Sequence, residues 1–393
     1  MKKKILYILS HPIQYQSPLL KNLAEQKEID LKVFYLTAHT SVGIDKQFGE
    51  KIDWDTPLLD GYNYEFIKNY SPKPAVSGSF FGLMNFSIIR KIRKENPDIV
   101  IIHGWAYFTN WLIFILSFLF KAKLWLRAES PLNQELKKNP FVLFFKKLVL
   151  KIFLFKIIKK FLYLGSQNKE FYKYHGVKDE KLVFAPYSVD NSRFLQEYKR
   201  LAPEKLNLKK ELNIPERHTV LLSVGKYITK KRPFDILEAF FLQKNENLTL
   251  VLLGEGNLRH RLEKKIKEQN IKNVHLTGFI NQSVISKYYT IADVFILAST
   301  IGETWGLVVN EAMNFGLPVI VSDMPGSAYD LIEHEKNGFV YKTGNIEKLS
   351  KYINFAVTNS EFRKTAKTIS LNKVKSFSYD IMVKNIINQI KTY

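Results

Sequence analysis

Short apolar runs alternate with longer amphipathic stretches along the whole chain of 393 residues. The runs are rich in Val, Ile and Leu, which is typical of strands that helices cover on both faces. The expected strands cover residues 4–10, 31–36, 99–103, 124–127, 161–164, 219–225, 248–254, 274–278, 294–298 and 318–322. Because helical patterns separate these strands, we predict an α/β protein with doubly wound parallel sheets built from βαβ units.

One stretch of irregular pattern divides the chain. Residues 183–207 carry two prolines and many polar side chains without a clear period, so we expect the domain boundary there. The length also favours two domains. We predict a Rossmann-like acceptor-side domain over residues 1–195, a second Rossmann-like domain over 205–375, and a last helix in 376–393 that can cross back over the first domain. Two such domains facing each other would place the carboxyl ends of both sheets at one cleft, where these folds bind ligands.

Composition narrows the class of protein. With 46% hydrophobic and 24% charged residues the chain is globular rather than disordered, and the lack of cysteine excludes disulfides and thiolate metal sites. The apolar run at the start is too short for a signal peptide, and the most apolar run, residues 112–120, is too short to span a bilayer. We therefore expect a cytoplasmic protein that does not span the membrane.

Charge predicts a polyanionic partner. The chain has 59 Lys and Arg against 37 Asp and Glu, a net charge of +22, which suits nucleic acid, an acidic membrane surface or phosphate-bearing substrates. Residues 137–160 hold eight lysines and no acid, and Lys146, Lys147 and Lys151 share one helical face. This pattern is typical of a basic helix on an anionic bilayer, and equally of a solvated lysine-rich helix face over a packed core. We favour contact with an anionic membrane, peripherally on the inner face of the cell membrane.

A basic loop in the second half is suited to phosphate. Residues 224–233 end an expected strand at Gly225 and place four cations ahead of a helix. A backbone turn, a helix N-terminus and the ammonium groups of Lys226 and Lys231 can together hold a diphosphate. The alternative is an ordinary basic loop on a strongly basic protein.

A second motif carries two carboxylates. Residues 299–313 place Glu303 in a loop and Glu311 in the following helix, with Gly306 between them. Two acids separated in this way can bind hydroxyl groups at different points along one ligand, while the helix N-terminus accepts a phosphate. The alternative is that Glu311 is only a polar residue on an amphipathic helix.

The first turn and one acidic pair complete the candidates. Residues 11–18 contain no glycine, unlike a dinucleotide-binding fingerprint, but can present Gln14 and Tyr15 to a polyhydroxylated ligand on the acceptor side. An ordinary strand-to-helix turn is the alternative. Asp53-Trp54-Asp55 matches a pattern by which another class of sugar transferases holds a divalent metal, but such short matches arise by chance. We expect no metal and no cofactor.

Together these residues resemble the retaining glycosyltransferase family 4, which has the GT-B fold of two facing Rossmann-like domains. The most specific part is residues 303–323, where seven residues separate Glu303 from Glu311. Residues 254–256, 292–294, 337–339 and 97–103 are also family-like. The resemblance implies transfer of a sugar from a nucleotide-diphosphate sugar to a glycan or lipid-linked glycan, with retention, in cell-surface polysaccharide synthesis such as capsule or O-antigen assembly.

The resemblance also implies residue roles. Lys226 and Lys231 would bind the donor diphosphate, Glu311 the ribose hydroxyls, and Glu303 the transferred sugar, with His103 beside that sugar. Phe279 and Ile280 would lie near the nucleotide base, and the backbone around Gly306 and Leu307 would meet the phosphates. The other implied donor-site residues are Gly225, Thr304 and Trp305. The first-turn glycines of the family are replaced here, which leaves phosphate contact from the first domain open. Thr304 and Trp305 stand where the family often has Gly-Phe.

Two other kinds of function stay open. One is a sugar-nucleotide epimerase, or a non-catalytic partner subunit, of the same GT-B fold. The other is a basic nucleic-acid-binding protein, which the charge allows although no binding module is recognisable. For the transferase, two lysines at the leaving phosphate predict a reaction that needs no metal.

Overall fold

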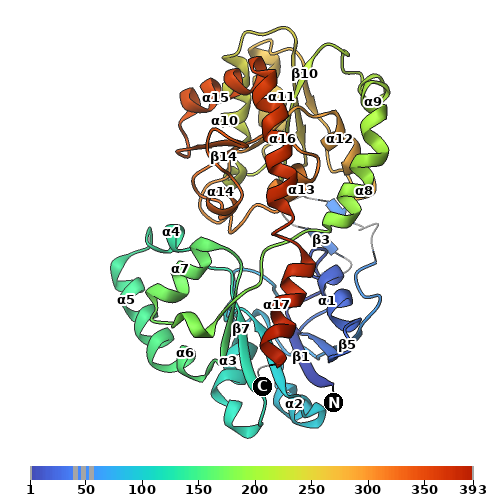
Figure 1. The fold of residues 1–393 in the computed structure, drawn as a ribbon. Coiled ribbons are helices and arrows are strands. Elements are labelled where there is room, and N and C mark those ends of the chain that lie inside the picture. Colours follow the sequence, from blue (N-terminus) through green and yellow to red (C-terminus); the bar gives the residue numbers. More distant parts are fainter. Residues whose placement is uncertain (1, 39–42, 46–49, 53–56, 392–393) are drawn as a thin grey trace. The chain divides into compact units, whose positions relative to one another are not determined.

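The computed structural model of the protein describes residues 2–38, 43–45, 50–52 and 57–391. The chain forms two compact units, each with a parallel sheet between helices (Figure 1). The first unit comprises Met1–Gly43, Pro57–Pro186 and Tyr379–Tyr393, and the second comprises Ile44–Thr56 and Tyr187–Ser378. The predicted α/β class with two Rossmann-like parallel sheets is confirmed.

The first sheet has the strand order β5-β2-β1-β6-β7-β8-β9. Its strands are β1 (Lys3–Leu9), β2 (Ile29–Tyr35), β5 (Asn63–Phe66), β6 (Ile99–His103), β7 (Lys123–Arg127), β8 (Lys160–Tyr163) and β9 (Leu182–Phe184). All neighbouring pairs are parallel. The two edge strands were not expected, because polar residues interrupt β5 and β9 has only 3 residues. The strand order reverses between β1 and β6, which is where such sheets bind ligands.

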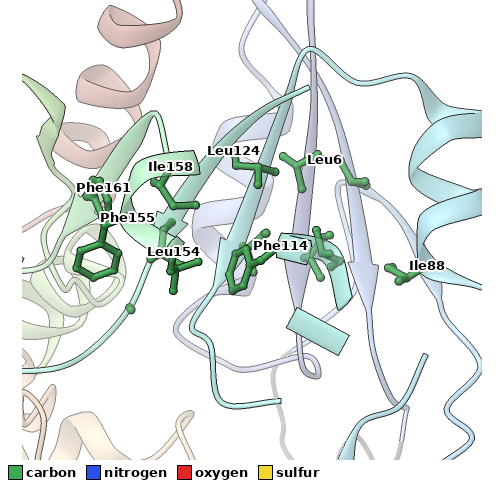
Figure 2. Close-up of a cluster of buried hydrophobic side chains, with 14 of the residues drawn as sticks. Leu6, Ile88, Phe114, Leu124, Leu154, Phe155, Ile158 and Phe161 are labelled. Atoms are coloured by element: carbon green, nitrogen blue, oxygen red, sulfur yellow. The ribbon is translucent and has the colours of Figure 1, made fainter. Parts of the chain in front are cut away.

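Helices cover both faces of this sheet. They are α1 (Ser17–Ala24), α2 (Ile88–Glu95), α3 (Phe108–Ile115), α4 (Leu132–Glu135), α5 (Pro140–Val149), α6 (Phe155–Ile157), α7 (Ser166–Tyr174) and α17 (Tyr379–Lys391), and a π-helical turn, Leu150–Leu154, joins α5 to α6. Alternate residues of β1 enter different cores, since side chains point to opposite faces of a strand. Leu6 packs in the core of Figure 2, with Phe114, Leu154 and Phe161, whereas Tyr7 packs in the core beneath α17.

The second sheet has the order β12-β11-β10-β13-β14-β15. Its strands are β10 (Thr219–Val224), β11 (Leu248–Leu253), β12 (Val274–Leu276), β13 (Val294–Leu297), β14 (Val319–Ser322) and β15 (Gly338–Tyr341). Its helices are α8 (Asn191–Leu201), α9 (Lys205–Glu211), α10 (Pro233–Phe241), α11 (Arg259–Glu268), α12 (Ile285–Ile291), α13 (Val308–Asn314), α14 (Ser327–Asp330), α15 (Ile346–Thr358) and α16 (Ser360–Val374). The order reverses between β10 and β13.

Short elements lie in the connections. They are the two-stranded sheet of β3 (Gly43–Asp45) and β4 (Glu50–Ile52) and the 3₁₀ turns Phe80–Gly82, Ser117–Leu119, Asp179–Lys181, Ala202–Glu204 and Thr229–Lys231. The last of these turns leads into α10, which begins with a proline, a residue whose fixed φ suits the first helical position.

The division between the two units lies within the irregular stretch of the sequence. The chain divides between Pro186 and Tyr187, inside the stretch 183–207 and ahead of residue 195, and this stretch contains the helix α8. This helix packs against α12 and α13 of the second unit. Few of its side chains are apolar, so its period was not visible in the sequence. The last helix, α17, packs against α1 and β9 in the first unit. The predicted cleft common to both domains stays a prediction.

Candidate functional site

The basic loop and the two-acid motif meet where the strand order of the second sheet reverses. Gly225 and Lys226 directly follow β10, and the loop that carries Glu303 follows the neighbouring strand β13. The backbone N–H of Thr300 donates a 2.8 Å hydrogen bond to the carbonyl of Lys230. The two sequence motifs therefore form one wall at the carboxyl edge of the sheet.

Lys231 and Glu303 form the charged centre of this wall. The Nζ atom of Lys231 lies 2.6 Å from Oε2 of Glu303, and the Nζ atom of Lys230 lies 3.8 Å from the same oxygen. Burial by itself would raise the pKa of the Glu303 carboxyl, but the two lysines outweigh burial and hold this pKa below its ordinary value. Glu303 is therefore a carboxylate at neutral pH. Because two lysines face one carboxylate, this wall keeps a net positive charge, which suits a phosphate group.

Two close backbone approaches shape the loop that follows β10. A Cβ atom on Gly254 would lie 2.0 Å from the carbonyl oxygen of Gly225, and one on Gly256 would lie 2.6 Å from that of Tyr227. Only glycine fits at both positions, because backbone atoms cannot move away as side chains can. The family-like segment 254–256 therefore packs directly under the turn that carries Lys226.

Glu311 is buried behind this wall. Helix α13 begins at Val308, so Glu311 lies in its first turn. Its side chain accepts a 2.6 Å hydrogen bond from the phenol of Tyr289, which is itself buried and stacked on Phe315. Burial raises the pKa of the Glu311 carboxyl, against the opposing effects of Tyr289 and the nearby Arg193. The alternative of an ordinary surface glutamate is wrong.

The loop between the two acids offers backbone rather than side chains. The Trp305 ring is buried, packs on Tyr187 and Phe377, and donates a 2.8 Å hydrogen bond from Nε1 to Oδ1 of Asn310. A ligand would therefore meet the backbone of residues 304–307 and not the indole. Gly306 has φ of 86°, a left-handed conformation that glycine adopts most readily.

The residues expected at the nucleotide base lie on the same sheet edge. Phe279 and Ile280 follow β12 and are half-buried. Gly278 just before them accepts a 3.0 Å hydrogen bond from the N–H of Gly254, which ties this segment to the loop after β11. The position of Phe279 and Ile280 suits contact with a flat nucleotide base, and their role in binding that base stays a prediction.

A separate cluster lies where the first sheet reverses. His103 ends β6, and its Nε2 atom lies 2.9 Å from Oε1 of Glu129, two residues beyond β7. His11 follows β1, is bonded to Ser10 at 2.9 Å, and has its pKa lowered to about 4 by burial and by the neighbouring His103. Sequence reasoning singled out His103 but missed Glu129 as its partner. The sequence signal that could have identified Glu129 is its position just after the strand expected at residues 124–127.

The first turn is attached to the last helix. The carbonyl of Tyr15 accepts a 2.9 Å hydrogen bond from the phenol of Tyr379 in α17. The side-chain nitrogen of Gln14 is buried and has no hydrogen-bond partner among the described residues. The pair Asp53 and Asp55 lies outside the described residues. Within the part of the chain that the structure describes, no group of three or more His, Cys, Asp or Glu could hold a metal ion.

Comparison with known families finds a match within the second unit. Residues 204–372 match the model of the family described as glycosyl transferases group 1. We refer to these matched residues as the group 1 domain. A curated relative of the chain, the alpha-monoglucosyldiacylglycerol synthase of Acholeplasma laidlawii, is 30% identical over 182 residues, which are 45% of this chain and 44% of the relative. The matched part of the chain spans about half the length of the curated relatives or less. Membership of family 4 in particular stays a prediction.

Solved structures extend the likeness to the whole chain. A glycosyltransferase from Rickettsia africae superposes with a TM-score of 0.76 at 18% identity, over 100% of this chain and 98% of that one. HepE of Anabaena, crystallised in complex with UDP and glucose, superposes with a TM-score of 0.74 at 17% identity, over 100% of both chains. These likenesses confirm the predicted GT-B class of fold around the group 1 domain.

Proposed function

We propose that this protein is a glycosyltransferase that moves a sugar from a nucleotide-diphosphate sugar to a hydroxyl group of a glycan or lipid-linked glycan. The observation that carries the proposal is the Lys231–Glu303 pair at the reversal point of the group 1 domain. The names of similar structures support the donor class, since HepE was crystallised with UDP and with UDP-glucose.

Each donor-site residue has a proposed role. Lys226 and Lys231 hold the diphosphate, and Lys231 can do so while bonded to Glu303 because an ammonium group has three N–H donors. The Glu303 carboxylate accepts hydrogen bonds from hydroxyls of the transferred sugar. Glu311 binds the ribose hydroxyls with the oxygen that Tyr289 does not occupy.

The proposed transfer retains the anomeric configuration. The bond between C1 of the sugar and the phosphate oxygen breaks, and its electron pair stays on the nucleotide diphosphate. The acceptor oxygen bonds to C1 on the same face, and its proton passes to the departing phosphate oxygen. Negative charge grows on the phosphate in the transition state, so Lys226 and Lys231 stabilise that state more than the ground state. We propose that this stabilisation makes a metal ion unnecessary.

The acceptor is proposed to be membrane-borne. The strong positive charge of the chain favours an anionic surface, and one curated relative is named as a glycolipid synthase. We place the reaction at the inner face of the cell membrane, in cell-surface polysaccharide synthesis. In the first unit, the cluster of His103, Glu129 and His11 is the proposed contact with the transferred sugar and the acceptor.

Thermal unfolding with UDP-, GDP- and dTDP-sugars tests the donor class, because a ligand that binds only the folded state raises the unfolding temperature. At least one of them should stabilise the protein, and Lys231→Ala should abolish that effect. The exposed Lys244→Ala serves as the matched control. If no nucleotide sugar stabilises the protein, the proposal is wrong. Conversion of the sugar nucleotide without an acceptor would instead indicate an epimerase.

A further inference from the structure

Helix α5 and the π-helical turn after it expose phenylalanines to the surface. Phe144 and Phe145 are 62% and 61% exposed, and Phe141 is 76% exposed. Val142, Leu148, Val149 and Ile152 of the same segment are also exposed, at 44% or more. Exposed apolar residues normally occur singly on a folded surface, and a contiguous set marks an interaction site.

The opposite side of this segment anchors it to the first unit. Leu150 and Leu154 are buried in the core that Figure 2 shows. Lys146 also points inward, with Nζ 2.6 Å from Oε1 of the buried Glu135 and 5.0 Å from the ring centre of Phe171. The lysine face predicted from the sequence is therefore wrong in part: Lys146 turns to the protein and the phenylalanines turn to the surface.

Trp111 of helix α3 continues the apolar surface. Its ring is stacked on Phe153 at 6.4 Å. One turn further along α3, Ile115 is 55% exposed, and Phe118 in the next turn is 76% exposed. Figure 1 shows α5 on the outside of its unit, with α7 on its inner side. We call this surface, the exposed residues of 141–153 with Ile115 and Phe118, the aromatic face.

Lysines border the aromatic face, and acids do not. No acidic residue occurs between Glu135 and Glu170, and Glu135 is buried. Lys151, Lys156 and Lys159 are exposed and form no ion pair with any described residue. Apolar side chains with a cationic border are complementary to an anionic lipid bilayer, in which rings enter the acyl region and lysines bind headgroups.

We propose that the aromatic face docks on an anionic membrane by inserting Phe141, Phe144 and Phe145 below the headgroups, with α5 lying in the plane of the surface. No helix in the described ranges is long and apolar enough to cross a membrane. A second copy of the chain is a poorer partner for the aromatic face. In a twofold contact the same patch lies on both sides, so the lysines of one copy would face the lysines of the other. This inference specifies the membrane contact of the proposed function, but it does not require the transfer reaction.

Vesicle sedimentation of the full-length protein tests the docking. Wild-type protein should bind vesicles of phosphatidylcholine with phosphatidylglycerol and should bind poorly to phosphatidylcholine alone. The double variant Phe144→Ser/Phe145→Ser should weaken binding by at least about tenfold, since it removes two large apolar groups from the buried contact. The control Phe241→Ser changes an exposed phenylalanine of the second unit and should bind as wild type.

A fluorescent label reports insertion directly. The chain has no cysteine, so Phe145→Cys gives one labelling site, and Phe241→Cys gives the matched control. An environment-sensitive dye at residue 145 should shift to the blue with anionic vesicles, whereas the dye at 241 should not. Equal vesicle binding of wild type and the double variant would overturn the proposal, and so would the absence of a blue shift at residue 145. A wild-type dimer that the double variant converts to a monomer would overturn it as well. Donor binding measured by thermal unfolding would be unaffected, so failure here is distinct from failure of the proposed function.

Discussion

The phenol of Tyr289 donates a 2.6 Å hydrogen bond to Oε2 of Glu311, and both side chains are buried. The two residues come from neighbouring helices, α12 and α13. The bond fixes one carboxylate oxygen and leaves the other for a ligand. Tyr289 is therefore a positioning residue for the proposed ribose contact.

Tyr289→Phe should weaken nucleotide binding. The variant keeps the ring stacked on Phe315 but removes the bond that orients Glu311, and a hydrogen bond to a charged group contributes about 1.5 to 3 kcal/mol. We expect the dissociation constant for the donor nucleotide to rise by about tenfold or more, measured by calorimetry. Tyr288→Phe is the control, since its hydroxyl makes no bond to Glu311 and binding should not change.

Lys231→Ala and Glu303→Gln should each lower turnover with little effect on folding. Lys231 stabilises the proposed leaving phosphate, and removal of one such group costs roughly 100-fold to 1,000-fold in kcat. Glu303→Gln keeps the size of the side chain but loses its charge. Initial rates and urea unfolding measure the two effects. Near-normal turnover in either variant would contradict the proposed donor site.

Glu129→Gln should lower transfer without changing donor affinity. Glu129 bonds His103 in the first unit, whereas the proposed nucleotide contacts are in the second. We expect a fall in kcat and an unchanged unfolding temperature shift on adding nucleotide. Glu170→Gln, on the exposed side of α7, is the matched control. Loss of nucleotide stabilisation in Glu129→Gln would argue for a structural role instead.

Chelator should leave the reaction unchanged. Lysines replace the metal charge in the proposed transition state, so the rate in excess EDTA should equal the rate without it. Initial rates with and without EDTA, after dialysis against chelator, measure this. Loss of activity in EDTA with recovery on adding a divalent cation would show that the lysines are not sufficient.

Stability should fall as the pH drops towards 4. His175 is fully buried between aromatic rings, and burial together with Lys146 lowers its pKa to about 4. Because the folded state binds the proton less tightly than the unfolded state, this contribution is complete above the ordinary pKa near 6.5. It is lost as the pH falls from there to about 4, on the order of 2 to 3 kcal/mol at most.

His175→Phe should reduce that dependence. Urea unfolding at about pH 7 and about pH 4.5 should show a smaller loss of free energy of unfolding in the variant than in wild type. Part of the loss should remain, because the pKa of His11 is also lowered to about 4. The exposed His260→Phe should behave as wild type. Equal losses in His175→Phe and wild type would contradict the assignment.

The local pattern of apolar and polar residues was enough to predict much of the fold. Each expected strand overlaps an observed one, because fully buried strands read as runs of Val, Ile and Leu whatever packs against them. The edge strands β5, β9 and β15 were missed, and α8 was missed because its buried residues are few. The relation of Lys231 to Glu303 was predicted as a shared site. The roles of Glu129 and Tyr289 were not predicted, because neither residue belongs to a recognisable motif and only the fold brings them to His103 and Glu311.

The sequence by itself determined the parallel α/β architecture, the glycine turn of the basic loop and the spacing of Glu303 from Glu311. These depend on backbone period and on residues a few positions apart. Only the tertiary structure decided that Lys146 is turned inward and Phe144 and Phe145 outward. Residues 141–153 are apolar on two sides of one helix, so periodicity alone cannot say which side is buried. Packing of Leu150 and Leu154 into the core decides it.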